Sequence, residues 1–306
     1  MEKGYGQMGL MEFQRKFRTE ESCRKHLFKL RWCAGFECPK CGHGECFDLA
    51  KRKLYQCKAC GYQVSVTAGT VMHRTRTPLR KWFWAIYLVS NDKRGLSALQ
   101  LSKKLKVSYY VAWTMLHKIR QAMADRNQLY QLRGVIEVDE SFYGGKKEGG
   151  DKRGRGTSKV PVMIEASTFE GGEGGRGLGF ARMRVVDSVD GATVEGVIGE
   201  DIAAGQEIVT DGWPSYNVAG RMGHEHVREV SGKEANAALK WVHILASNSK
   251  AFLLGTFHGI GRKHLQSYLD EFCYRFNRRR WEDELFDRLV TACANSSGVT
   301  YSELTA

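Results

Sequence analysis

The sequence predicts a multidomain protein of the α+β class, and three observations support this fold class. Residues 36–66 are rich in turns and carry two C-x-x-C pairs. Helical patterns precede this segment in residues 1–32 and return from Pro78 to about Leu132. From Gly134 onward, strand-like alternation takes over, and a long amphipathic helix follows it. This order of patterns fits three modules better than a single fold.

We expect domain boundaries where the character of the sequence changes. The first segment is residues 1–66, with N-terminal helices and the cysteine pairs, and the second is residues 67–133, which contain a pair of helices. A domain built on strands should cover residues 134–294, and residues 295–306 should form a tail. A chain of 306 residues is long enough to bury a core in each of two to three domains.

The C-terminal half contains four strand candidates, which read GVIEVDESFYGG, KVPVMIEASTF, LGFARMRVVDS and QEIVTDGW. The glycine-rich stretches KKEGGDKRGRGTSK and GGEGGRG lie between strands and predict loops. Near the end, HLQSYLDEFCYRFNRR predicts an amphipathic helix. Its apolar stripe consists of Leu265, Tyr268, Leu269, Phe272 and Phe276.

The two cysteine pairs have the spacing of a metal site. Cys38 and Cys41 form the first pair, Cys57 and Cys60 form the second, and fifteen residues separate them. A glycine follows each pair, and glycine permits the positive φ that a tight knuckle needs. Four thiolates form a closed tetrahedral zinc site without an open position, so we expect structural zinc and assign it no catalysis. Free buried cysteines are the alternative reading.

The net charge of +13 is unevenly distributed along the chain. Residues 1–133 hold 26 Lys+Arg against 9 Asp+Glu, a balance of +17, whereas residues 134–306 hold 21 against 25, a balance of −4. A modest excess would only indicate a well-solvated surface. An excess confined to one half indicates a module that binds a polyanion, and nucleic acid is the favoured partner.

A helix-turn-helix is expected within residues 95–123. The first helix should be capped near Ser97, Val107 and Ser108 should form the turn, and the second helix should run from Tyr109 to Met123. A second helix of this kind fits the major groove of double-stranded DNA. Any helical hairpin gives a similar pattern, but the cysteine pairs and the charge favour DNA binding. The expected shared core consists of Leu99, Leu105, Val111, Met115 and Ile119.

Acidic residues follow apolar strand residues at two places. Asp139 shares one face of its strand with Glu137, while Glu140 points to the other face. Asp211 closes a second apolar strand before a turn. Carboxylates at neighbouring strand ends can hold two divalent ions that activate a water or a 3′-hydroxyl and stabilise the leaving oxygen of a phosphodiester. The alternative is that both residues only cap their strands.

The chain resembles the zinc-ribbon insertion-sequence transposases of the DDE superfamily, the ISXO-like group. The motifs that carry the resemblance are CPKCG, CKACG, VDESFYGGKK, TDGWPSY, SKAFLLGTFHG and HLQSYLDEFCYRFNRR. The resemblance implies an RNase H-like α/β catalytic domain, Mg²⁺ or Mn²⁺ as catalytic ions, and cleavage and joining of transposon ends. It also implies that Asp139 is the first catalytic acid, Asp211 the second, and Lys250 the basic residue after the third.

The residue at the position of the third catalytic acid differs from the family pattern. Many relatives place a Glu seven residues before the lysine, whereas here this residue is His243, and Asn248 lies two residues before Lys250. Either neutral side chain can ligate a divalent ion, although less strongly than a carboxylate for Mg²⁺. Spacing favours His243 slightly. The alternative without a functional role is that His243 is a packed or solvated histidine and that Asn248 caps a helix.

The predicted function is therefore that of a DNA transposase acting on transposon ends and target DNA. We expect a homo-oligomer, because two ends must meet. Without a signal peptide or an apolar run of membrane-spanning length, a cytoplasmic, nucleoid-associated bacterial protein is expected. One alternative is a zinc-ribbon DNA-binding regulator with a decayed, non-catalytic RNase H-like domain, and another is a nuclease without strand transfer. The sequence does not specify four properties: the terminal-repeat sequence, the target sequence, the oligomer size and whether this copy is active.

Overall fold

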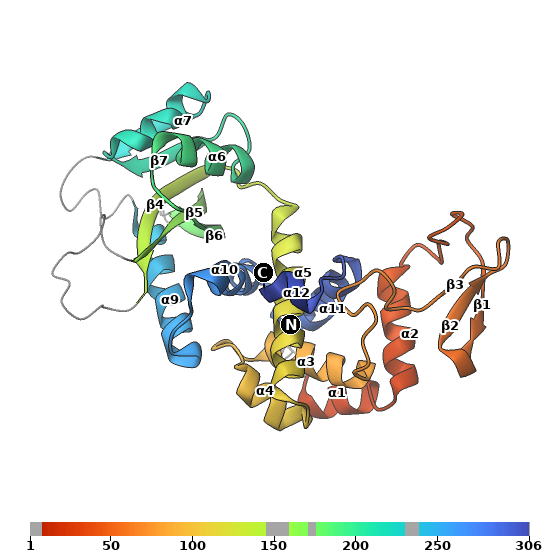
Figure 1. The fold of residues 1–306 in the computed structure, drawn as a ribbon. Helices are drawn as coiled ribbons and strands as arrows, with labels where there is room; N and C mark the ends of the chain where they lie inside the picture. Colours follow the sequence, from red (N-terminus) through yellow and green to blue (C-terminus); the bar gives the residue numbers. More distant parts are fainter. Residues whose placement is uncertain (1–7, 145–158, 171–175, 230–238, 306) are drawn as a thin grey trace, which may run out of the picture. The chain divides into compact units, whose positions relative to one another are not determined.

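The computed structural model describes residues 8–144, 159–170, 176–229 and 239–305. The chain divides into two compact units (Figure 1). The first unit combines Met1–Arg126 with Arg280–Ala306, and the second is Asn127–Arg279. The two predicted glycine-rich loops lie largely outside the described residues.

The first unit is mainly helical. The predicted helical segment in residues 1–32 consists of two helices, because a capping box begins a new helix at Thr19. The Thr19 hydroxyl accepts from the Ser22 amide at 3.1 Å, and the Thr19 amide donates to the Ser22 hydroxyl at 3.2 Å. The helices are α1 (Leu10–Lys16), α2 (Glu20–Arg31), α3 (Leu79–Asn91), α4 (Ala98–Leu105), α5 (Tyr109–Gln128), which crosses into the second unit, α11 (Leu285–Asn295) and α12 (Tyr301–Thr305).

Aromatic side chains form the core of this unit, and the C-terminal helix α11 contributes to it. The Phe286 ring lies 5.5 Å from the ring of Phe13 and 5.4 Å from that of Phe17. An Asp287 carboxylate oxygen lies 2.8 Å from Nε2 of His26 on α2. Because α11 completes this core, the structural border falls at residues 279 and 280 and does not coincide with the predicted border at residue 294.

The helical pair α4–α5 forms much as predicted. The Ser97 hydroxyl accepts from the Gln100 amide at 3.2 Å and caps α4. The turn begins at Lys106, whose φ is +51°. One predicted core residue is wrong: Leu99 is 54% exposed, and Leu101 is fully buried in its place. Leu99 and Leu101 are two positions apart, which corresponds to about 200° around the helix axis, so only one of them can face inward.

A small antiparallel sheet follows α2. Its strands are β1 (Cys46–Leu49), β2 (Leu54–Cys57) and β3 (Gln63–Val64), in the order β1-β2-β3. The turn η1 (Ala50–Arg52) joins the first two strands, and Lys53 after it has a φ of +55°. This sheet holds the second cysteine pair at the end of β2.

The second unit is built on a five-stranded mixed sheet in the order β6-β5-β4-β7-β8. The central strand β4 pairs antiparallel with β5 and parallel with β7. All four strand candidates are confirmed, whereas β8 was missed because EHVRE lacks an apolar pattern. The strands are β4 (Val135–Tyr143), β5 (Val160–Glu170), β6 (Arg176–Val185), β7 (Glu207–Asp211) and β8 (Glu225–Glu229).

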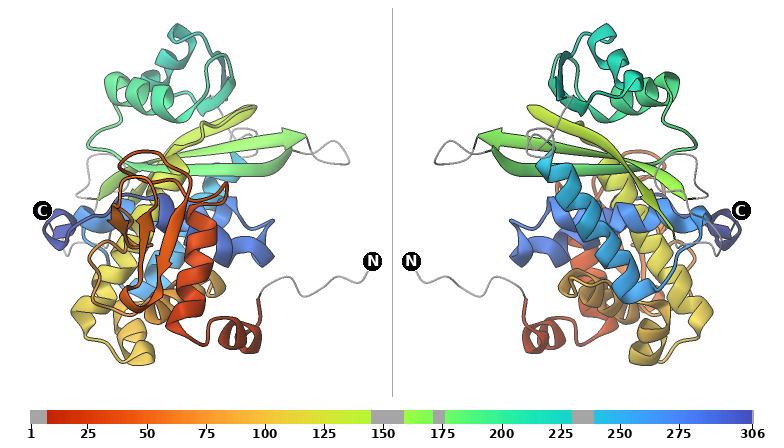
Figure 2. Two further views of the ribbon diagram at one scale, coloured as in Figure 1. Left: turned by 90° about the vertical axis from the view of Figure 1, so that its right-hand side faces the viewer. Right: turned by 90° about the vertical axis from the view of Figure 1, so that its left-hand side faces the viewer.

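Helices cover both faces of this sheet (Figure 1 and Figure 2). One face packs against α9 (Lys240–Phe257) and α10 (Arg262–Asn277), and the predicted apolar stripe of α10 is turned to this core. The other face packs against α6 (Gly191–Asp201), η3 (Pro214–Asn217) and α7 (Val218–Arg221). In the described part of the chain, no helix is both long and apolar enough to cross a membrane.

Candidate functional site

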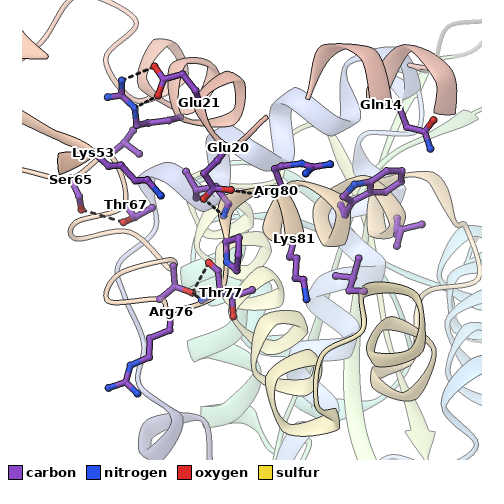
Figure 3. A pocket seen from close by; sticks show the side chains of 18 of the residues that line it. Gln14, Glu20, Glu21, Lys53, Ser65, Thr67, Arg76, Thr77, Arg80 and Lys81 are labelled. Atoms are coloured by element: carbon purple, nitrogen blue, oxygen red, sulfur yellow. Dashed lines mark hydrogen bonds and ion pairs between the residues drawn. The ribbon is translucent and has the colours of Figure 1, made fainter. Parts of the chain in front are cut away.

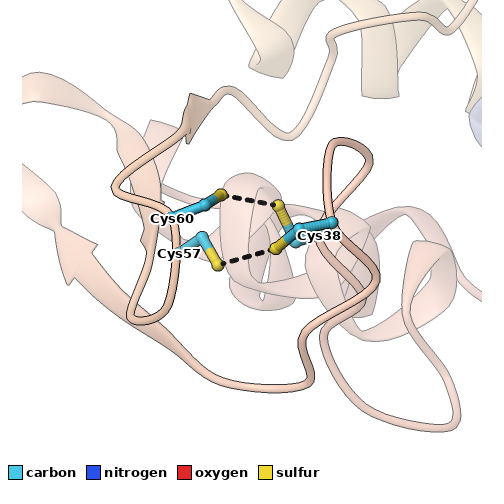
Figure 4. Close-up of side chains that lie close together, drawn as sticks. Cys38, Cys57 and Cys60 are labelled. Carbon is cyan, nitrogen blue, oxygen red and sulfur yellow. Dashed lines mark hydrogen bonds between the residues drawn. The ribbon is translucent and has the colours of Figure 1, made fainter.

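The four predicted cysteines meet at one point (Figure 4). The Sγ atoms of Cys38 and Cys60 lie 3.7 Å apart, and those of Cys41 and Cys57 lie 3.6 Å apart. A tetrahedral zinc ion with Zn–S bonds of about 2.3 Å separates its sulfurs by about 3.8 Å, so these thiolates fit structural zinc. Among the residues that the structure describes, these cysteines form the one compact group of three or more metal-ligand side chains.

The backbone at each cysteine pair explains why the knuckles form. Gly42 and Gly61 have φ angles of +74° and +69°, as their positions predicted. The Gly42 amide donates to the carbonyl of Cys38 at 2.8 Å, and the Gly61 amide donates to that of Cys57 at 3.1 Å. Each knuckle is thus closed by its own hydrogen bond, which brings the two thiols of a pair to the same side.

A basic cleft of about 1210 Å³ opens in the first unit beside the small sheet (Figure 3). Its two carboxylates are engaged within the chain. Glu20 accepts from the amides of Leu79 and Arg80 at 2.6 and 3.1 Å, and Glu21 accepts from Arg24 at 2.8 and 2.9 Å. The remaining charged side chains that line the cleft are all cationic and come from the small sheet, α3, α4 and the segment before α3: Lys53, Arg76, Arg80, Lys81 and Lys104.

The sheet register brings the two predicted acids side by side. Val138 on β4 pairs with Thr210 on the parallel strand β7, and Asp139 and Asp211 come one residue later in each strand. Asp211 ends β7, as predicted. Asp139, however, lies in the middle of β4, because β4 continues its pairing with β5 as far as Tyr143. Asp139 therefore lies at the point where the parallel strand β7 ends beside β4.

The predicted alternation of side chains along β4 is confirmed. Glu137 faces α9, because its Oε2 accepts from the amides of Trp241 and Val242 at 2.7 and 3.1 Å. Glu140 faces the opposite side, where its Oε2 accepts from the Tyr216 hydroxyl at 2.8 Å. Burial raises the pKa of Glu137 to about 7. Burial, followed by the charge of Glu140, raises the pKa of Tyr216, so its hydroxyl stays a donor.

His243 and Lys250 lie on the side of α9 that faces β4. Nδ1 of His243 is 3.8 Å from Oδ2 of Asp139. Lys250 donates from Nζ to the Ser141 hydroxyl at 2.6 Å, and its charge lies 5.2 Å from the centre of the Tyr143 ring. Seven residues make about two turns, which places both on one side of the helix. Burial, followed by the charge of Lys159, lowers the pKa of Lys250.

Asn248 does not lie on the side of α9 that faces β4. It is exposed on α9, and five residues from His243 correspond to about 140° around the helix axis. Sequence reasoning missed Ser141 and Tyr216, which contact the predicted residues directly. Tyr216 belongs to the quoted TDGWPSY motif and Ser141 to the quoted VDESFYGGKK motif, so the resemblance held a signal for both.

Comparisons with known proteins match both halves of the chain. Residues 131–277 match the ISXO2-like transposase domain, and residues 18–63 match the transposase zinc-ribbon domain. An uncharacterized protein in transposable element ISH50 of Halobacterium salinarum is 25% identical over 284 residues, which are 85% of this chain and 91% of that protein.

Solved structures give only weak superpositions. A chain of the pre-cleavage Mos1 transpososome has a TM-score of 0.28 at 11% identity and covers 69% of this chain and 78% of its own. A chain of the Mos1 strand transfer complex has a TM-score of 0.23 at 11% identity and covers 68% of this chain and 77% of its own. At these TM-scores the superpositions do not establish a shared fold. By their sequence matches, residues 131–277 belong to the ISXO2-like transposase domain family, and residues 18–63 belong to the transposase zinc-ribbon domain family.

Proposed function

We propose that the protein is an active DNA transposase that binds the terminal inverted repeats of an insertion sequence and cleaves and joins DNA. The observation that carries this proposal is the convergence of three segments in the second unit. Asp139 and Asp211 are adjacent in the parallel register of β4 and β7, and His243 on α9 lies 3.8 Å from Asp139. A mixed sheet with helices on both faces supports an RNase H-like assignment for this unit.

Asp139, Asp211 and His243 are the proposed ligands of the catalytic Mg²⁺ or Mn²⁺ ions. Two ligands at about 2.1 Å from one such ion lie between about 3 and 4.2 Å apart, and the Asp139–His243 separation falls in this range. The bound ions would polarise the scissile phosphate and activate a water or a 3′-hydroxyl. Lys250 lies on the same side of α9, where its ammonium can contact a DNA phosphate.

His243 is preferred to Asn248 as the third ligand because of its position on α9. Both side chains are exposed, but His243 lies near Asp139, whereas Asn248 lies about 140° farther around the helix. An imidazole is a weaker ligand than a carboxylate for Mg²⁺, and Mn²⁺ accepts a nitrogen ligand more readily than Mg²⁺ does. We therefore expect higher activity with Mn²⁺ than with Mg²⁺.

DNA binding is proposed for residues 1–133, and the basic cleft is its proposed phosphate contact. The cleft draws its cations from the small sheet, α3 and α4, so one DNA backbone can contact the zinc ribbon and the proposed helix-turn-helix together. Simultaneous replacement of Lys53, Arg80 and Lys104 by Ala should reduce the salt dependence of end binding by about 0.9 in log–log slope per lost phosphate contact. Lys29→Ala, which removes an exposed charge outside the cleft, is the matched control.

Catalysis is tested by replacing each acid in the full-length chain. Asp139→Ala and Asp211→Ala should each abolish cleavage of a DNA fragment with both inverted repeats, while end binding in a parallel gel-shift assay stays nearly unchanged. The full chain is required, because α11 completes the core of the DNA-binding unit. Normal cleavage by both variants would contradict the assignment of the two acids. Absence of cleavage by the unsubstituted protein, with end binding retained, would favour a zinc-ribbon regulator with a decayed catalytic domain.

The oligomeric state follows from the proposed reaction. Two transposon ends must be held together before joining, so a homo-oligomer is expected on DNA. Light scattering of the protein with and without paired-end DNA would measure it.

A further inference from the structure

Three carboxylates lie close together on β4, and each is held differently. Oδ1 of Asp139 accepts from the backbone amide of Glu140 at 2.8 Å, while its Oδ2 faces His243. Glu137 and Glu140 instead bond to segments far away in the sequence. Asp139 therefore bonds to a neighbouring amide and faces His243, whereas Glu137 and Glu140 each bond to another segment of the fold.

Glu137 bonds to the first turn of α9. The amides in the first turn of a helix have no partner within the helix. Leu239 at the start of α9 gives no side-chain cap, and Oε2 of Glu137 accepts from the amides of Trp241 and Val242 instead. A negative charge is favourable at this end of a helix. Glu137 is only 2% exposed, and the bond therefore fixes the start of α9 on β4, one residue before His243.

Glu140 holds the segment on the other side. Its Oε2 accepts from the hydroxyl of Tyr216, which is fully buried in η3. The turn η3 begins three residues after Asp211, the last residue of β7. The bond consequently ties the segment that follows Asp211 to the residue that follows Asp139.

We propose that Glu137 and Glu140 are positioning residues and not metal ligands, and that each holds one of the two segments that complete the site around Asp139. This inference rests on the proposed function, because it assumes that Asp139, Asp211 and His243 act together. Glu137 positions His243 through α9, and Glu140 positions Asp211 through Tyr216. The acid-rich sequence of β4 thus divides between one ligand and two structural acceptors.

Amide substitutions separate the two roles in the full-length protein. Glu137→Gln and Glu140→Gln keep an oxygen that accepts the same hydrogen bonds but lose the negative charge. Both should retain cleavage within a few-fold of the unsubstituted protein. Asp139→Asn also keeps an oxygen, but a ligand of a divalent ion needs the charge, so its cleavage rate should fall by orders of magnitude.

Removal of the bonds themselves should produce a further effect. Glu137→Ala and Tyr216→Phe should lower the cleavage rate by about tenfold or more, because a small misplacement of reacting groups is costly. Both should also raise the Mn²⁺ concentration needed for half-maximal cleavage. Tyr274→Phe, which removes a buried tyrosine hydroxyl on α10, is the matched control and should leave both values unchanged. Thermal unfolding and end binding are measured in parallel.

The outcomes distinguish this inference from the proposed function. If Glu137→Gln or Glu140→Gln is as inactive as Asp139→Asn while folding and end binding are retained, the positioning roles are wrong and the proposed function stands. Tyr216→Phe with normal rate and normal Mn²⁺ dependence would likewise refute the role of Glu140. If Asp139→Asn cleaves normally, the catalytic site proposed around Asp139 is wrong and this inference fails with it. Absence of cleavage by the unsubstituted protein would instead refute the proposed function.

Discussion

The zinc ribbon and the proposed acidic metal site differ in how the chain brings their side chains together. The four cysteine ligands come from two knuckles in one short stretch, and the knuckles close through local backbone hydrogen bonds. The acidic site draws Asp139, Asp211 and His243 from two parallel strands and a later helix. The first centre therefore depends mainly on spacing, whereas the second depends on sheet register and on the placement of α9.

The local centre is expected to be the most sensitive to a single substitution. Cys57→Ser should remove zinc and leave the small sheet β1-β2-β3 poorly folded, because zinc takes the place of a core in so short a segment. Metal analysis and circular dichroism would measure both effects. Cys33→Ser, an exposed cysteine outside the cluster, should keep one zinc per chain. Full zinc occupancy in Cys57→Ser would refute the assignment.

The distributed centre is tested at its third position. His243→Ala should lower cleavage by orders of magnitude, while Asn248→Ala, with its side chain on another side of α9, should change it little. His243→Glu should raise activity with Mg²⁺, because a carboxylate is the harder, charged ligand. Cleavage rates with Mg²⁺ and Mn²⁺ would measure all three. The reverse ranking of the two alanine variants would identify Asn248 as the ligand.

The difference between the two centres also explains what the sequence could predict. The cysteine spacing and the positive φ of the following glycines depend on local geometry, and both predictions agree with the structure. The alternation of Glu137 and Glu140 followed from the period of a strand. The partners of these two residues did not, because Trp241 and Tyr216 reach them only through the packing of the whole sheet.

Packing accounts for the remaining differences between prediction and structure in the same way. Leu99 and Leu101 both fit an apolar helix pattern, and only the neighbours of α4 decide which of them faces inward. The association of α11 with the first unit depends on an aromatic core whose residues are far apart in the sequence. A local sequence pattern does not predict such contacts. The metal-binding role proposed for Asp139 and Asp211 came from their positions at strand ends as well as from the family resemblance. The role proposed for Lys250 came from the resemblance alone.

The helical pair α4–α5 offers a smaller test of packing against pattern. Leu101→Ala should lower the free energy of unfolding by about 2–5 kcal/mol, because it empties a fully buried position. Leu99→Ala should change it by less than about 0.5 kcal/mol, since the side chain is 54% exposed. Chemical denaturation of both variants would measure this. Equal losses would show that the predicted core with Leu99 is correct.

A carboxyl outside both centres tests the effect of burial within the second unit. Burial raises the pKa of Asp270 from its ordinary value of 3.8 to about 7. The folded state therefore binds this proton more tightly, so the contribution of Asp270 to stability is present at low pH and is lost as the pH rises through about 7. Asp270→Asn should remove this pH dependence of the unfolding free energy. An unchanged pH profile would contradict the raised pKa.

Binding of Mn²⁺ to the full-length, zinc-loaded protein tests most directly whether two independent metal centres exist. Electron paramagnetic resonance would measure bound Mn²⁺, and metal analysis would measure zinc in the same samples. Asp139→Ala and Asp211→Ala should each lose Mn²⁺ binding while they keep one zinc per chain. Mn²⁺ binding that is unchanged in both variants would contradict the assembly of a catalytic metal site by β4, β7 and α9.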